Sequence, residues 1–193
     1  MQLTFNITQI NSSERLLEVL PPLVALYQQV FAEPPENQVW LRSQVKEMLV
    51  SYQETGDLLV TFDGDDNPIG FCATIPFTSS KVWQSQVSDG FLTHALDEEF
   101  LRERFDIDAF EALYIADLIV APSFRRQGLA SQLMKTAIGG RKPVLLRVSL
   151  CRESAIALYQ KLGFKPMSLF QTARYKQSDG EVKTFEKMLM MLS

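Results

Sequence analysis

The sequence predicts an α/β fold, in which one mixed β-sheet carries helices on both of its faces. Short segments with strand-like alternation of apolar and polar residues take turns with longer segments whose apolar residues recur at helical spacing. No linker, repeat or low-complexity block divides the chain, and 193 residues suit one well-buried domain better than two. We therefore expect residues 1–193 to form a single domain.

The chain begins with an expected strand around residues 3–7, where apolar residues alternate with polar ones. A helix follows, because Ser12 or Ser13 can cap it and the next residues place leucines, valine and tyrosine on one side. Pro21 and Pro22 lie inside this pattern, so the helix should be kinked or restarted there.

A second amphipathic helix is expected over about residues 39–52. Two apolar runs, residues 57–62 and 68–77, flank the turn-forming sequence DGDDN and predict a hairpin. Residues 79–110 are polar and aromatic, with a helical pattern over 91–105. This long insert fits either a structural filler or a lid over a binding site.

The second half of the chain alternates strands and helices more clearly. Gly139 and Gly140 predict the end of its first helix. A closing hairpin is expected near the C-terminus, with its turn at residues 178–180. The expected elements are a strand over 113–121, a helix over 125–138, a strand over 143–150, a helix over 153–162 and a strand over 163–170.

The composition is that of an ordinary globular protein, with 46% hydrophobic and 22% charged residues. A net charge of −4 supplies no basic field for nucleic acid. No apolar run approaches the roughly 18 residues of a membrane span, and the N-terminus lacks a signal-peptide pattern. The two cysteines, Cys72 and Cys151, show no metal-ligand spacing, so we expect a cytoplasmic protein without metal.

The strongest chemical signal is a strand that leads through a glycine-containing loop directly into a helix, over residues 118–130. The first amides of a helix lack partners, and the helix dipole adds positive charge there, so this site attracts phosphate. Gly128 and Ala130 would let a ligand approach the backbone. The helix dipole disfavours the positive charges of Arg125 and Arg126 at this end of the helix until an anion binds. Alternatively, the two arginines are a solvated surface pair, or the glycine loop belongs to a nucleotide site.

The same segment resembles the acetyl-CoA signature of the GNAT superfamily, (Q/R)-x-x-G-x-(G/A), with Arg125, Gly128 and Ala130 at its three specified positions. A second segment, AIALYQKLGF over residues 155–164, is similar to the later helix of that family and its Gly-Phe ending. The two motifs cover about residues 112–166. The resemblance implies a twisted, mostly antiparallel central sheet with a splayed parallel pair, helices on both faces, and acetyl-CoA as cosubstrate.

The resemblance also assigns roles to residues. Loop amides from Arg126 to Ser131 would bind the pyrophosphate, and the strand before the loop would hold the pantetheine arm and acyl carbonyl. Tyr159 occupies the position of the tyrosine that protonates the departing thiolate, although it also fits a core aromatic position. The expected cofactor-binding residues are Leu118, Ile119, Val120, Arg125, Arg126, Gln127, Gly128, Leu129, Ala130, Ser131 and Arg152.

Two departures from the family pattern concern the cofactor and the base. Arg152 stands where many members have an asparagine that contacts the cofactor. That contact is lost here or replaced by an ionic contact to the phosphates of the cofactor. The strand face that carries a base in some members holds Tyr114 and Ala116 here, and Asp117 points to the opposite face. The remaining candidates for the base are Glu33, Glu36, Glu111 or a chain of waters.

Two functions follow from the resemblance. The first is N-acetylation of a primary amine on a small molecule or peptide, by a monomer or homodimer. The second is a degenerate member that binds acyl-CoA as a sensor without turnover. Acidic residues at 33, 36 and 97–99 favour a cationic acceptor. We expect His94 to lie on a helix with no catalytic role, and Cys151 to be a small buried residue.

Overall fold

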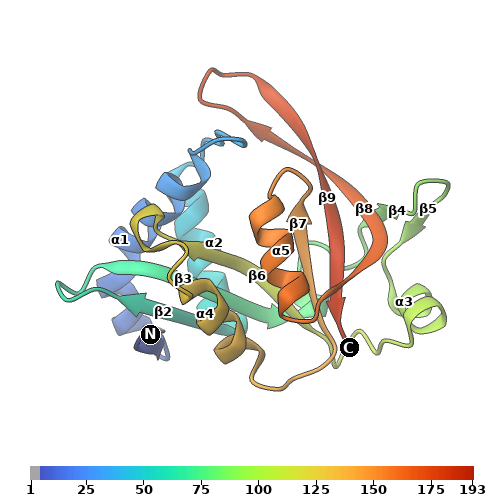
Figure 1. Cartoon of the computed structure of the whole chain (residues 1–193), viewed down its shortest axis with the longest axis horizontal. Helices are drawn as coiled ribbons and strands as arrows, with labels where there is room; N and C mark the ends of the chain where they lie inside the picture. The colour runs from blue at the N-terminus through green and yellow to red at the C-terminus, as the bar shows by residue number, and fades with distance from the viewer. Residues whose placement is uncertain (1–4) are drawn as a thin grey trace. The chain divides into compact units, whose positions relative to one another are not determined.

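A computed structural model describes residues 5–193. Its β-strands form one nine-stranded mixed sheet in the order β1-β2-β3-β6-β7-β9-β8-β4-β5, which confirms the predicted fold class. Within the described residues the sheet is accompanied by five α-helices, labelled α1–α5 (Figure 1). The chain divides into two compact units. Unit 1 comprises residues 5–74, 117–139 and 176–182, and unit 2 comprises residues 75–116, 140–175 and 183–193.

Unit 1 contains the first three strands, the outer half of β6 and three helices. Its hairpin follows the predicted bounds closely, and Thr61 pairs with Gly70 near its turn. The expected first strand is found at residues 7–9, and Leu3 lies outside the described residues. The elements are β1 (Ile7–Gln9), α1 (Ser13–Phe31), α2 (Arg42–Thr55), β2 (Asp57–Phe62), β3 (Pro68–Pro76), β6 (Leu113–Val120) and α4 (Leu129–Ile138).

Neighbouring residues of β3 show why unit 1 has helices on both faces of its sheet. The ring of Phe71 stacks on Tyr27 of α1, with ring centroids 6.4 Å apart. Because side chains alternate along a strand, Gly70 faces the other side, where a Cβ would lie 3.2 Å from Leu129 of α4. The two faces are therefore covered by α1 and by α4 (Figure 1), and eight of the nine residues of β3, all but Pro76, are buried.

Helix α1 runs without interruption through Pro21 and Pro22, so of the two predicted outcomes, a kink or a restart, the restart does not occur. Ser12 is its N-cap, and the hydroxyl accepts a hydrogen bond from the amide of Arg15, as expected. Both prolines are exposed, so water can satisfy the carbonyls that lose their intrahelical partners. The opposite side of the helix buries eight residues, including Leu23, which stabilises the helix through packing.

Unit 2 is built around β7, which pairs with β6 on one side and β9 on the other. The β6–β7 pairing is parallel and joins only Leu113–Ile115 to Val144–Leu146. The β7–β9 pairing is antiparallel and continues to Ser149. Apart from the insert after β3, the elements of this unit are β7 (Val144–Ser149), α5 (Glu153–Lys161), β8 (Lys165–Lys176) and β9 (Val182–Leu192).

The insert that follows β3 also belongs to unit 2. It contains β4 (Gln86–Ser88), β5 (Thr93–Ala95) and α3 (Glu98–Phe105), and β4 extends the sheet by pairing Ser88 with Phe170 of β8. His94 therefore lies on a strand and not on the expected helix. The helix begins only at Glu98 because Asp97 caps it by accepting from the amide of Phe100. No helix among the described residues is both long and apolar enough to cross a membrane.

Candidate active site

The predicted phosphate loop lies between the end of β6 and the start of α4, within unit 1. Gly128 is the N-cap of α4 and adopts a left-handed conformation with φ of 91°, which glycine adopts without steric cost. Gly128 has no side chain that could cap the helix, so at this position no hydroxyl or carboxylate accepts from the amides of the first turn. The loop therefore presents an uncapped helix N-terminus, which is a suitable partner for an anion.

Arg125 braces this loop through its side chain. Its Nε donates to the carbonyl of Val120 at 3.2 Å, which ties the loop to the end of β6. Its guanidinium also forms an ion pair of 2.7 Å with Glu33, in the loop after α1. The positive charge near the helix N-terminus is thus already compensated by a carboxylate, and Glu33 is engaged at this loop. Arg126, by contrast, has an exposed side chain and a left-handed φ of 64°.

The outer half of β6 has one edge against β3 and one edge facing away from it. The amide of Ala121 donates to Ile69 of β3 at 2.8 Å, and the carbonyl of Ile119 lies close to Gly70. Backbone groups of successive strand residues point to opposite edges, so those of Leu118 and Val120 point away from β3. Of the three residues expected to hold the pantetheine arm, Leu118 and Val120 have the suitable backbone orientation.

Asp117 is held by Tyr52, a residue that sequence reasoning did not single out. The hydroxyl of Tyr52, near the end of α2, donates to the Asp117 carboxylate at 2.6 Å. Burial raises the pKa of the Cys72 thiol, and the charge of Asp117 raises it further. This arrangement agrees with the expected structural role of Asp117. Tyr52 lies on the same side of α2 as the buried Val45 and Leu49, so its position in the sequence indicates packing and does not reveal such a contact.

Tyr159 and Arg152 belong to unit 2. Tyr159 lies on α5, is 9% exposed, and its ring packs against Phe164 with centroids 6.0 Å apart. A general acid and a packing residue both fit this environment. Arg152 is the N-cap of α5, and its side chain is half-buried. Cys151 is exposed, so the expectation that it is buried is wrong, because it lies in the turn between β7 and α5.

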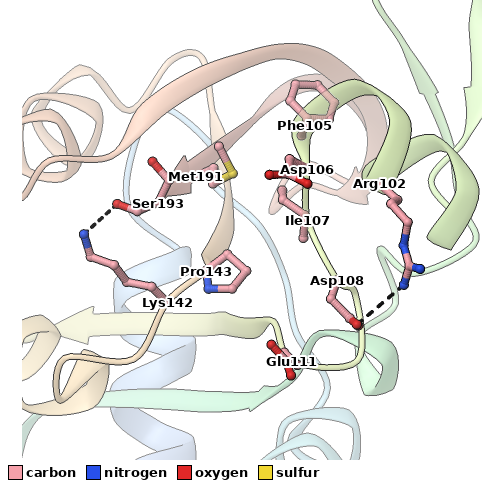
Figure 2. Close-up of a pocket in the computed structure, with 10 residues that line it drawn as sticks. All are labelled: Arg102, Phe105, Asp106, Ile107, Asp108, Glu111, Lys142, Pro143, Met191 and Ser193. Carbon is pink, nitrogen blue, oxygen red and sulfur yellow. Dashed lines mark hydrogen bonds and ion pairs between the residues drawn. The ribbon is translucent and has the colours of Figure 1, made fainter.

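The remaining candidate bases occupy different surroundings. Glu36 is buried in unit 1, where it is 2% exposed. Tyr114 is buried in unit 2, and its ring contacts Phe77 with centroids 6.0 Å apart. Glu111 is exposed and lines an open pocket of about 560 Å³ with Asp106 and apolar side chains (Figure 2).

Two cations that border the pocket around Glu111 make internal contacts. Figure 2 shows Arg102 directed at Asp108, 3.5 Å away, and Lys142 donating to the backbone oxygen of Ser193 at 2.6 Å. The cations that border this pocket are therefore already paired. None of the residues expected to bind the cofactor is among the described residues that line it.

The parallel pair that ends early and the uncapped N-terminus of α4 agree with the class that the two motifs implied, a coenzyme A-dependent acyltransferase. Comparison with family models agrees with this class. Residues 54–166 match the model described as an acetyltransferase (GNAT) domain. Because this match covers more than half of the chain, the protein belongs to the GNAT acetyltransferase family, as the two motifs indicated.

Solved structures show the same fold at low sequence identity. The chain is similar to the ribosomal-protein-S18-alanine N-acetyltransferase of Escherichia coli, with a TM-score of 0.60, 18% identity and coverage of 98% of this chain and 93% of that chain. An N-acetyltransferase of Staphylococcus aureus Mu50 is similar with a TM-score of 0.63 and 15% identity, and the match covers 97% of this chain and 98% of that chain. Arabidopsis thaliana NAA60 in complex with acetyl-CoA is similar with a TM-score of 0.60 and 17% identity, and the match covers 98% of this chain and 99% of that chain. No curated protein matches the sequence.

Proposed function

We propose that the protein is an N-acetyltransferase that transfers an acetyl group from acetyl-CoA to a primary amine, with the whole chain acting as one catalytic domain. The observation that carries the proposal is the uncapped N-terminus of α4, reached through Arg126 and Gly128 in left-handed conformations. Such a turn directs successive backbone amides toward one point, where a pyrophosphate accepts their hydrogen bonds. The family membership and the acetyl-CoA complex of a protein with the same fold support this choice of cosubstrate.

The proposed reaction is direct attack. The neutral amine attacks the thioester carbonyl, a new N–C bond forms, and the resulting intermediate expels the thiolate as the C–S bond breaks. The amine gives up one proton to a chain of waters, the thiolate gains one, and the same waters can return a proton to the donor of the second. Tyr159 supplies the proton to sulfur in this proposal, because a phenol with a pKa of about 10 is protonated at neutral pH. The backbone of Leu118 or Val120 holds the acyl carbonyl.

The alternative function is that of an acyl-CoA sensor without turnover. It is favoured by one observation: the strand face expected to carry a base holds Tyr114, which is buried, and Ala116. Neither side chain accepts a proton readily at neutral pH.

Two measurements on the full chain distinguish these functions. Isothermal titration calorimetry with acetyl-CoA measures cofactor binding, and release of free thiol in the presence of a panel of primary amines measures turnover. Binding together with amine-dependent thiol release supports the acetyltransferase. Binding without thiol release for any amine supports the sensor, and failure to bind acetyl-CoA contradicts both.

A further inference from the structure

Arg147 is a half-buried arginine of unit 2 whose charge has no carboxylate partner among residues 5–193. Its Nη1 donates to the side-chain oxygen of Gln171 at 2.7 Å. Two other half-buried arginines of the chain, Arg15 and Arg125, form ion pairs with glutamates at 2.8 and 2.7 Å. The protein carries more acids than bases, yet a neutral amide stands beside Arg147.

The neighbours of Gln171 fix the direction of this contact. The Ser85 hydroxyl donates to the carbonyl of Val82, so its lone pairs accept from the Gln171 amide nitrogen. That nitrogen also donates to the carbonyl of Gln86 at 3.2 Å. Because a carbonyl can only accept, the oxygen of Gln171 must face Arg147. The guanidinium is thus held in place through one of its five N–H groups, which leaves others for a ligand.

The position of Arg147 in the sheet is equally specific. The parallel pairing of β6 with β7 ends at Ile115 and Leu146, so Arg147 is the next residue of β7. It shares a face with Leu145, which pairs with Tyr114 of β6. This is the strand face on which some family members carry a base. The insert that follows β3 covers the same face, because Phe77 contacts Tyr114 and Ser85 contacts Gln171.

We propose that Arg147 binds an anionic group, a carboxylate or a phosphate, that the acetyl acceptor carries beside its reactive amine. A half-buried guanidinium is poorly hydrated, and its fork of donors matches two oxygens of such a group. The inference rests on the proposed N-acetyltransferase function and names its class of acceptor. It differs from the cationic preference expected from the sequence, because several acids behind that expectation have internal partners: Glu33 pairs with Arg125, and Asp97 caps α3.

Matched pairs of amines test the proposal. Phosphoethanolamine is compared with ethanolamine, and β-alanine with β-alaninamide, by thiol release from acetyl-CoA. We expect kcat/KM to be at least about 10-fold higher for the anionic member of a pair, since a charge-assisted contact contributes this much or more. In Arg147→Met the ratio within each pair should fall to about 1, mainly through KM. Arg147→Lys should keep part of the preference, because it keeps the charge without the fork.

Arg174→Met is the control, because Arg174 is exposed on β8 and should leave the ratio unchanged. Binding provides a second readout that does not depend on turnover: phosphoethanolamine should raise the melting temperature of the wild type and of Arg174→Met, but not of Arg147→Met. Thiol release without a preference within the pairs overturns the inference and leaves the acetyltransferase intact. Arg147-dependent binding without thiol release for any amine supports the anion site and contradicts the acetyltransferase. A wild type that shows neither preference nor binding overturns the inference.

Discussion

The hydroxyl of Tyr52 on α2 donates a hydrogen bond of 2.6 Å to the carboxylate of Asp117 on β6. This contact joins the helix that precedes the hairpin to the strand that leads into the phosphate loop. It also holds a carboxylate close to the buried thiol of Cys72, whose pKa is raised by burial and by the charge of Asp117. The pair therefore supports the strand on which the acyl group is proposed to lie.

Removal of the Tyr52 hydroxyl should reduce stability without changing the fold. Tyr52→Phe keeps the ring and loses a hydrogen bond to an ionised group, so we expect the free energy of unfolding in urea to fall by about 1 to 2 kcal/mol. A double-mutant cycle with Asp117→Asn checks that the loss belongs to this pair. Strictly additive effects of the two substitutions would show that the contact contributes nothing to stability.

Gly128 provides a test of the phosphate loop, and Gly139 provides its control. Both glycines are left-handed and stand at opposite ends of α4. Asp at either position should cost about 1 kcal/mol of stability, because side chains adopt this backbone conformation reluctantly. Only Gly128→Asp places bulk and negative charge at the proposed phosphate site. We expect it to weaken acetyl-CoA binding at least about 100-fold by calorimetry, with Gly139→Asp close to wild type. Equal affinities for all three proteins would contradict the proposed site.

The sequence was sufficient to predict most strands and helices of the second half of the chain and the loop before α4. The helix expected from residue 125 begins at Leu129, and the strand expected to end at residue 170 continues to Lys176. In these segments the local signals agree: apolar residues recur at regular spacing, and a glycine occupies the cap position at each end of α4. In α1 the restart that the two prolines allowed does not occur, because packing of one apolar side outweighs the breaking effect of Pro21 and Pro22. Local propensity is a weak determinant when tertiary contacts oppose it.

The site was less predictable than the fold, because its contacts join residues that are distant in the sequence. Ninety-two positions separate Glu33 from Arg125, and no periodicity connects them. The loop motif indicated an arginine near the phosphate, whereas the structure shows its guanidinium paired with a carboxylate. His94 was placed on a helix because the pattern of residues 91–105 is helical throughout, but Asp97 caps the helix only after the hairpin.

The hairpin of β4 and β5 should lose stability in acid through Asp89. The amides of Leu92 and Phe91 donate to this carboxylate at 2.9 and 3.0 Å, and with His94 they hold the pKa of Asp89 well below its usual range. A lowered pKa in the folded state means that the carboxylate stabilises the fold above the unfolded pKa, which is about 4. That contribution is lost as the pH falls below about 4.

The difference between wild type and Asp89→Asn isolates this effect from other carboxylates. Wild type should have the higher melting temperature at pH 7, and the difference should shrink steadily between about pH 5 and pH 3. Differential scanning calorimetry across this range measures it. A difference that stays constant with pH would mean that the charge of Asp89 does not contribute.

The two cysteines should differ sharply in reactivity. Cys72 is fully buried and the pKa of its thiol is raised, so it holds almost no thiolate at neutral pH, while Cys151 is exposed. With a chromogenic disulfide reagent at pH 8, one thiol per chain should react in the folded protein and a second only in denaturant. Cys151→Ser should abolish the first reaction. Prompt reaction of both thiols in the native protein would contradict the burial of Cys72.

Tyr159 can be tested by separating its ring from its hydroxyl. The side chain is buried on α5 and packs on Phe164, so the ring contributes to the core whatever the hydroxyl does. Tyr159→Phe keeps that packing and removes the proton donor. If Tyr159 is the general acid, turnover should fall by roughly 10²- to 10⁴-fold, the usual contribution of a positioned acid, while acetyl-CoA affinity changes little.

The comparison with Tyr159→Ala assigns the role of the residue. Alanine removes the ring as well, and a buried aromatic lost in this way costs about 3 to 5 kcal/mol of stability. For a general acid, both variants lose turnover but only alanine loses stability. For a packing residue, Tyr159→Phe retains wild-type turnover and only alanine fails, through poor folding. Because the two variants share the acceptor and the assay, the ratio of their turnover numbers, read beside their urea midpoints, decides whether the proton comes from this phenol.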